Sequence, residues 1–337
     1  MQKNLTCGRD ILCKRLGSLK KYILVTMEEP YKLISDMAKP VSIIYNYEMT
    51  EENLEKLARE RRDGEYIVGF GGGTACDTAK YLSSKWNLPL IIAPSVVSVD
   101  AWLCKSIAVR HSYKVRYIGD VTANEFIVDY AIMQKSPEIL NKAGVSDVLS
   151  ITTALGDWRI SRDVFGDRYD VSYYDASYNI AKELLLKERE IAMHSEEGLK
   201  SIVRGQLMEV LLCEDWGNSR PEEGGEHFLG YCLEELTHKH YIHGLLIALN
   251  ILVVLKLQRD RAVFDHREIA RFFKNIGLDI SFQKQNITRE EYREALMRTG
   301  EYVKRENLYN GIFSLNNIFD EKGEYSLDEI VEWASSL

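Results

Sequence analysis

The sequence lacks several features of exported, membrane-spanning and nucleic-acid-binding proteins. Residues 1 to 18 carry charges throughout and have no continuous apolar core, so we expect no signal peptide. The apolar run from Leu245 to Leu255 is too short to span a bilayer, which needs about 20 residues. We therefore expect no membrane span. No run of lysine and arginine stands out, so we do not expect nucleic acid as a partner either.

Cysteine is scarce, and its spacing excludes two classes of small cysteine-rich fold. The chain has 6 cysteines, and none of them forms a CxxC pair. Isolated cysteines favour reduced thiols over disulfides or a zinc knuckle. We therefore expect a cytoplasmic protein, and the sequence also allows a homo-oligomer.

The length and composition are those of a two-domain globular protein. At 337 residues, the chain is about twice the usual domain size. Hydrophobic residues make up 45% and charged residues 28%, which is ordinary for a globular protein. The 43 basic and 51 acidic side chains give a net charge of -8, which again argues against nucleic acid.

Strand and helix patterns alternate in the first part of the chain and then give way to helices. The predicted strands are Lys21 to Met27, Val41 to Tyr45, Glu65 to Phe70, Leu88 to Ala93 and two within Tyr113 to Asp129; the predicted helices between them are Pro30 to Met37, Thr50 to Arg62 and Thr74 to Trp86. This alternation predicts a Rossmann-like α/β domain, residues 1 to 136, built on a parallel sheet. The strand signal stops near Pro137, so residues 137 to 337 are predicted to form an all-α domain.

A glycine triplet, Gly71 to Gly73, lies between a predicted strand and a predicted helix. Without side chains, its backbone N–H groups can approach a pyrophosphate at the positive end of the helix. The pattern is not GxGxxG, and a simple tight turn is the alternative. Asp77, one turn into the helix, is assigned to the same cofactor site, with a helix-dipole partner as its alternative.

The loop from Pro94 to Trp102 follows the carboxyl end of the next strand, where open parallel sheets bind ligands. Its Ser95, Ser98 and Asp100 offer two hydroxyls and a carboxylate to a cofactor or a polyol, although an ordinary turn uses the same residues. Three basic residues that follow are candidates for an anionic group or, individually, for solvated surface charges: Lys105, Arg110 and Arg116.

Two histidines and one aspartate in the helical part are candidate metal ligands. His227 opens a helical pattern, and His243 opens a second one that is apolar on nearly every face. Two helices joined by a short turn would lie antiparallel, so spacing alone does not bring these histidines together. Asp147 lies beside the apolar stripe of a predicted helix, Ala143 to Ile160, and needs a partner there. A salt bridge to arginine, or histidines satisfied within a core, are the alternatives.

The order of five motifs resembles one superfamily: GGGTACDTAK, APSVVSVDA, AGVSDVLSITTALGDW, SRPEEGGEH, and HG before an apolar helix. Together they are similar to the iron-containing alcohol dehydrogenases, glycerol dehydrogenases and dehydroquinate synthases. Within this superfamily, the AGxxD, TAxxDW and SRPxxGxEH segments look nearest to those of the sn-glycerol-1-phosphate dehydrogenases. The resemblance covers residues 65 to 255 in pieces and implies a dehydroquinate synthase-like fold.

The resemblance also implies a cofactor, a metal and a set of site residues. It assigns NAD(H) or NADP(H) to Gly71, Gly72, Gly73, Ser95 and Ser98. It assigns one divalent metal, expected to be Zn²⁺ with Fe²⁺ or Ni²⁺ as alternatives, to Asp147, His227 and His243. It assigns substrate contact to Asp100.

The activity that the resemblance implies is metal-dependent, NAD(P)H-linked reduction of dihydroxyacetone phosphate to sn-glycerol 1-phosphate. A dehydrogenase of an unphosphorylated polyol, a dehydroquinate synthase-like cyclase and a silent binding protein remain alternatives. The sequence departs from the family pattern at Gly225, where Ser is usual, and at Leu245, where Glu is usual. The segment after Asp100, AWLCKSIAV, also differs in length, which leaves the phosphate contacts open.

Overall fold

The computed structural model describes residues 3–111 and 113–337. The chain forms two compact units, which we describe separately. The first unit comprises residues up to Lys142 together with His194–Leu199, and the second comprises Ala143–Met193 and Lys200–Leu337. The boundary therefore lies between residues 142 and 143, a few residues after the predicted one between 136 and 137.

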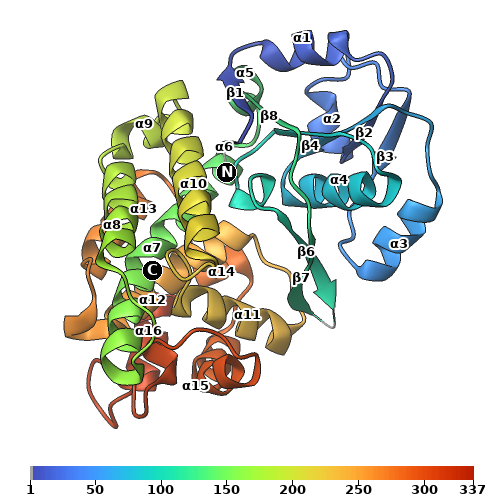
Figure 1. Ribbon diagram of the computed structural model, residues 1–337. Helices are drawn as coiled ribbons and strands as arrows, with labels where there is room; N and C mark the ends of the chain where they lie inside the picture. Colours follow the sequence, from blue (N-terminus) through green and yellow to red (C-terminus); the bar gives the residue numbers. More distant parts are fainter. Residues whose placement is uncertain (1–2, 112) are drawn as a thin grey trace. The chain divides into compact units, whose positions relative to one another are not determined.

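The first unit is built on a six-stranded sheet with the order β1-β8-β5-β4-β2-β3, in which all neighbouring strands are parallel (Figure 1). Its strands are β1 (Leu5–Gly8), β2 (Tyr22–Thr26), β3 (Ser42–Tyr45), β4 (Tyr66–Gly71), β5 (Leu90–Pro94) and β8 (Glu125–Asp129). The central strands β2, β4 and β5 are almost entirely buried, as expected for a parallel sheet covered on both faces. The predicted α/β fold is confirmed.

Helices cover both faces of this sheet. The helices of the first unit are α1 (Ile11–Ser18), α2 (Glu28–Lys32), α3 (Glu51–Arg59), α4 (Gly73–Trp86), the short η1 (Asp100–Trp102), α5 (Tyr130–Met133) and α6 (Glu138–Ala143). On one face, Leu24 and Phe70 of the sheet share a core with Leu12 of α1. On the other face, α4 lies so close to β4 that a Cβ on Gly69 would be 2.7 Å from the Cβ of Ala79. Gly69 therefore sets the distance between strand and helix.

Some elements of the first unit were not predicted. The hairpin of β6 (Ser106–His111) and β7 (Lys114–Asp120) forms a separate antiparallel sheet, and only β7 was expected. The strand β6 buries only Ile107 and Val109, which is too short a pattern to identify. The edge strand β1 and helix α1 were missed as well. The helix predicted at Pro30 to Met37 is confirmed only in its first residues, because α2 spans Glu28–Lys32 and turns follow.

The second unit is helical throughout its described residues, as predicted. Its helices are α7 (Val145–Ile160), the π-helical η2 (Ser161–Phe165), α8 (Val171–Leu185), α9 (Glu188–Ala192), α10 (Glu196–Trp216, beginning in residues of the first unit), α11 (Gly225–Thr237), α12 (His243–Gln258), η3 (Arg259–Arg261), α13 (His266–Asn275), α14 (Phe282–Gln285), α15 (Arg289–Arg305), η4 (Ile312–Ser314) and α16 (Leu327–Ser335). None of the described helices combines the length and apolar sequence needed to cross a membrane.

Two helices form the centre of the second unit. α12 is buried from Gly244 to Leu255, which confirms that a helix apolar on every face is buried on every face. α7 packs against it and is buried at nearly all positions, including several polar ones. Polar side chains in such a core need partners within it, and those of α7 lead to the candidate site described below.

Candidate active site

The glycine triplet of the first unit has three different roles. Gly71, the last residue of β4, has a φ of 153°, and a Cβ there would lie 2.7 Å from the Cβ of Ala75. The positive φ and the lack of space for a Cβ both require glycine at this position. A Cβ on Gly73 would be 3.2 Å from a Val99 methyl, which is tight. At Gly72, by contrast, a Cβ would make only ordinary contacts, at 3.5 Å to Val96 and 3.9 Å to Ser98, so packing does not require glycine there.

Gly72 is the N-cap of α4, and no side chain among the described residues caps this helix there. The first turn of α4 therefore presents backbone N–H groups at the positive end of a fourteen-residue helix. Such a helix start binds phosphate without further side chains. The local structure is that predicted for a pyrophosphate cradle.

Ser95 and Ser98 lie beside this cradle. The backbone N–H of Ser95 donates to the Gly71 carbonyl at 3.0 Å, and the Ser95 carbonyl accepts from the Ser136 hydroxyl at 2.7 Å. Ser98 Oγ is the atom 3.9 Å from an ideal Cβ on Gly72. The structure thus brings the predicted cofactor residues of the two loops together, with Ser98 nearest to the open side of the turn.

Asp77 has a structural role that differs from its predicted one. Its Oδ1 accepts from Lys80 Nζ at 2.7 Å, and its Oδ2 accepts from the Ala108 N–H at 3.1 Å. Both side chains are almost fully buried, and burial raises the pKa of Asp77 while Lys80 opposes that rise. Because both carboxylate oxygens are used within the fold, we assign Asp77 to structure and not to the cofactor.

Lys80 connects α4 to the loop that carries Asp100. Its ammonium donates to the Ala101 carbonyl at 2.6 Å and to the Ser106 carbonyl at 3.0 Å. Asp100 begins the short helix η1, and one of its oxygens accepts from Cys104 Sγ at 3.0 Å. The buried ion pair therefore fixes both ends of the segment 101–106, which directly follows Asp100.

The candidate phosphate-binding cations do not form one cluster. Lys105 directly precedes β6, and Arg110 and Arg116 lie on the two strands of the hairpin. Val109 is opposite Arg116 in the hairpin register, so Arg110 and Arg116 are on opposite faces of the two-stranded sheet. At most one of these two arginines can face a given anion.

In the second unit, the structure brings the three predicted metal ligands together. One ligand atom from each of Asp147, His227 and His243 lies within 4.8 Å of the others. His243 Nε2 is 3.4 Å from Asp147 Oδ1, and the two imidazole rings have centroids 5.2 Å apart. Asp147 and His227 are buried, whereas the His243 side chain is 31% exposed, so the cluster has one open side.

Glycines explain how distant segments reach this cluster. α11 and α12 make contact through their first halves, where a Cβ on Gly230 would be 3.3 Å from Asn250 Nδ2. Asn250 in turn donates to the Glu226 carbonyl at 2.9 Å. Side-by-side antiparallel packing would instead set His243 beside the end of α11. A Cβ on Gly244 would be 2.2 Å from the Ala143 carbonyl oxygen, so glycine after His243 allows α12 to approach the segment before Asp147.

His227 has a buried carboxylate partner that the sequence reasoning missed. Its Nδ1 is 2.8 Å from Glu226 Oε1, and Glu226 is completely buried. Burial acts against protonation of the ring, but the Glu226 hydrogen bond and nearby negative charges raise the pKa of His227 to about 10. The ring thus sits in an electronegative site that favours a cation. A glutamate directly before a histidine, at the start of an apolar helix, was the available signal.

Asp157 is a second buried carboxylate that was not predicted to matter. Its Oδ2 accepts from the Gly225 N–H at 2.8 Å, and its Oδ1 accepts from the Ile312 N–H at 2.9 Å and from Gln258 Nε2 at 2.8 Å. It therefore holds the start of α11, where His227 stands. A charged residue among the apolar positions of α7 was the signal for this role.

Gly225, one of the departures from the family pattern, is explained by local packing. A Cβ at this position would be 3.0 Å from a ring carbon of Phe313 and 3.2 Å from an Ile312 methyl. The space that a serine side chain would need is filled by η4. Leu245, the other departure, is buried in the core beside its neighbours on α12.

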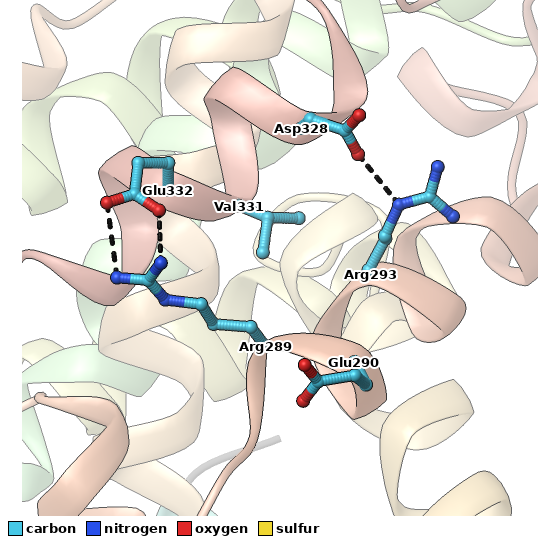
Figure 2. Close-up of a pocket in the computed structure, with 6 residues that line it drawn as sticks. All are labelled: Arg289, Glu290, Arg293, Asp328, Val331 and Glu332. Atoms are coloured by element: carbon cyan, nitrogen blue, oxygen red, sulfur yellow. Dashed lines mark hydrogen bonds and ion pairs between the residues drawn. The ribbon is translucent and has the colours of Figure 1, made fainter.

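The three ligands fit a divalent metal of the catalytic type. Two imidazoles and one carboxylate are donors that Zn²⁺, Fe²⁺ and Ni²⁺ accept, and three protein ligands leave a coordination position open. The surface cleft shown in Figure 2 has a different character. It lies between α15 and α16, and the ion pairs Arg289 with Glu332 and Arg293 with Asp328 bridge it, so its charges are already paired.

Sequence comparisons agree with this arrangement. A family model described as iron-containing alcohol dehydrogenase matches residues 25–137. A glycerol-1-phosphate dehydrogenase [NAD(P)+] from Thermoplasma volcanium is 27% identical over 281 residues, covering 83% of this chain and 76% of the relative. One of the same name from Bacillus licheniformis is 23% identical, covering 75% and 68%. Over residues 25–137 the chain is similar to the iron-containing alcohol dehydrogenases.

Solved structures of the family have the same fold. A probable glycerol dehydrogenase from Sinorhizobium meliloti superposes with a TM-score of 0.72 at 17% identity, covering 99% of this chain and 97% of that one. A sulfoacetaldehyde reductase from Bifidobacterium kashiwanohense, solved in complex with NAD+, gives 0.65 at 16% identity, with the same coverage. The solved structures show the fold, and the family-model match together with the sequence relatives supports an NAD(P)-dependent oxidoreductase of the alcohol dehydrogenase type.

Proposed function

We propose that the chain catalyses the metal-dependent, NAD(P)H-linked reduction of dihydroxyacetone phosphate to sn-glycerol 1-phosphate. The observation that carries this proposal is the convergence of Asp147, His227 and His243 in a chain whose relatives are named glycerol-1-phosphate dehydrogenase. We infer the substrate from the names of the relatives, and we infer the chemistry from the three side chains. We expect Zn²⁺ as the ion, because its tetrahedral preference suits three protein ligands and one open position.

Separate groups of residues bind the cofactor, the metal and the substrate in this proposal. We assign the pyrophosphate to the N–H groups of the Gly71 to Gly73 turn, with an added hydrogen bond from the Ser98 hydroxyl. Asp147, His227 and His243 hold the divalent ion. When bound, the ion supplies Lewis-acid polarisation of a ketone, and the nicotinamide supplies the hydride. We assign to Asp100 the acceptance of a hydrogen bond from a substrate hydroxyl.

We further propose a reducing compartment, the cytoplasm, as the location. All six cysteines lie within the described residues, and none of them forms a disulfide. Cys76 and Cys232 are buried, and burial raises the pKa of the Cys232 thiol to about 11, which keeps it protonated. Cysteines that form no disulfide are typical of reducing compartments.

An assay with two substrates tests the proposed function. The purified, Zn²⁺-loaded protein is mixed with NADH or NADPH and either dihydroxyacetone phosphate or dihydroxyacetone, and the loss of absorbance at the reduced nicotinamide band is followed. We expect oxidation with dihydroxyacetone phosphate and little with dihydroxyacetone. The product should be inert to an enzyme specific for sn-glycerol 3-phosphate. Equal rates with both ketones would instead indicate a polyol dehydrogenase, and no oxidation with either would reject both.

A further inference from the structure

Glu226 is buried at the start of α11, and every polar atom of its side chain is used. Oε1 accepts from the Gly224 N–H at 2.9 Å and is 2.8 Å from His227 Nδ1, while Oε2 accepts a short hydrogen bond from the Thr153 hydroxyl. Thr153 stands on α7, two turns after Asp147. The carboxylate thus connects the two helices that carry Asp147 and His227.

The contact with Glu226 determines which nitrogen of His227 can bind a cation. A carboxylate accepts hydrogen bonds only, so Nδ1 must be the protonated nitrogen of a neutral ring. Nε2 then keeps its lone pair. Metal-binding imidazoles commonly need such a partner, because it fixes the tautomer and the ring orientation and makes the ligating nitrogen more basic.

The negative charge of Glu226 is balanced only in part within the second unit, because Arg220 also faces Asp157. Arg220 is buried nearby and donates to the Asn310 carbonyl at 3.1 Å and to the Ala154 carbonyl at 3.2 Å. It interacts electrostatically with both Asp157 and Glu226. Because one buried cation faces two buried carboxylates, the surroundings of His227 retain negative charge that a divalent ion can balance.

We propose that Glu226 is a positioning residue of the metal site. It orients His227 with Nε2 toward Asp147 and His243 and thereby increases the affinity for the divalent ion, while Thr153 holds Glu226 in place from α7. This inference rests on the proposed function, because it assumes that the three ligands bind a metal. It adds a residue outside that ligand set.

The matched control for this proposal lies on the same helix. Glu234, also buried and also on α11, has an oxygen 3.4 Å from His240 Nδ1, so it is a second carboxylate–imidazole contact. His240 is exposed and is not a member of the ligand cluster. Glu234→Gln therefore removes the same charge from the same helix without touching the proposed site.

The test measures metal affinity directly, independently of turnover. The metal is removed with a chelator, and Co²⁺ or Zn²⁺ is titrated back, followed by the visible Co²⁺ absorption and by competition with a chromophoric chelator. We expect Glu226→Gln to weaken affinity by about 10- to 100-fold and to alter the Co²⁺ spectrum. We expect Glu234→Gln to bind like the wild type. Melting of the metal-free proteins separates lost stability from lost affinity.

Three outcomes distinguish the possibilities. Wild-type affinity and spectrum in Glu226→Gln would overturn the positioning role, even if its metal-free form melted at a lower temperature. Wild-type binding in His227→Ala would instead show that the metal site itself is wrong. If Glu226→Gln does not fold, Thr153→Val gives the answer, since it removes only the hydroxyl. A smaller loss of affinity in Thr153→Val supports the proposal, and unchanged affinity rejects it.

Discussion

The candidate cofactor site of the first unit and the candidate metal site of the second unit are built in different ways. The cofactor cradle of the first unit is made by leaving side chains out, so that Gly71 to Gly73 expose the backbone at the start of α4. The metal cluster of the second unit is made by burying polar side chains, and His227 has a further buried carboxylate, Glu226, as its partner. A site made from backbone groups can thus be formed by neighbouring residues of the sequence. A site made from buried side chains depends on residues that are far apart in the sequence.

The largest expected effect comes from removing a metal ligand. His227→Ala should lose more than about 100-fold in metal affinity and lose turnover with it, because loss of a ligand should exceed the 10- to 100-fold typical of an outer partner. Elemental analysis after gel filtration and the two-ketone assay provide the measurements. His240→Ala is the control, since His240 is exposed and outside the cluster. A variant at His227 that kept both metal and activity would show that the site lies elsewhere.

The next effect concerns the buried ion pair under the cradle. Lys80→Met leaves the Asp77 carboxylate buried without its cation and should lower the free energy of unfolding by about 3–5 kcal/mol. Chemical denaturation of the metal-free protein measures this loss. Lys85 lies on the same helix as Lys80 and forms an exposed ion pair with Glu55 of α3. Lys85→Met should therefore change the free energy of unfolding by about 1 kcal/mol or less. If Lys80→Met were stable but failed to bind the cofactor, Asp77 would have to be assigned to the cofactor site after all.

Gly71→Ala tests the backbone part of the comparison. The new methyl would meet the Cβ of Ala75 at 2.7 Å in a conformation that favours glycine, so we expect a loss of about 1–3 kcal/mol in stability and weaker cofactor binding. Metal affinity should not change. Thermal denaturation, cofactor titration and metal titration give the three values. Unchanged stability would mean that the turn is not constrained as described.

The smallest structural effect is expected at Gly72, where the methyl has room. Gly72→Ala should alter the free energy of unfolding by less than about 0.5 kcal/mol. The methyl would nevertheless occupy the open side of the cradle, between Val96 and Ser98, so the KM for NAD(P)H should rise. Steady-state kinetics at varied cofactor concentration measures this change. If KM stayed at the wild-type value, the pyrophosphate would not bind at this turn.

The sequence was sufficient where the determining pattern is local. The alternation of strands and helices predicted the parallel sheet, and the apolar pattern after His243 predicted a fully buried helix. Failures occurred where the pattern is short or exposed, as in β1 and β6. These strands depend on tertiary pairing more than on their own residues.

The candidate site was only partly predictable for the same reason. The family resemblance selected the three metal ligands, but nothing in the spacing of His227 and His243 required their rings to meet. That proximity depends on close packing at Gly230 and Gly244, which only the three-dimensional structure reveals. The roles of Glu226 and Asp157 also escaped prediction, because a buried carboxylate is recognised by its partners and not by its neighbours in sequence.

The most direct test of the account is to locate a bound ion. Crystals grown with Zn²⁺ and measured at the zinc absorption edge should show one strong anomalous peak, about 2.0–2.2 Å from a ligand atom of each of Asp147, His227 and His243. The His227 ligand atom should be Nε2. A peak at other residues, or an active protein with no peak among these three, would contradict the central claim.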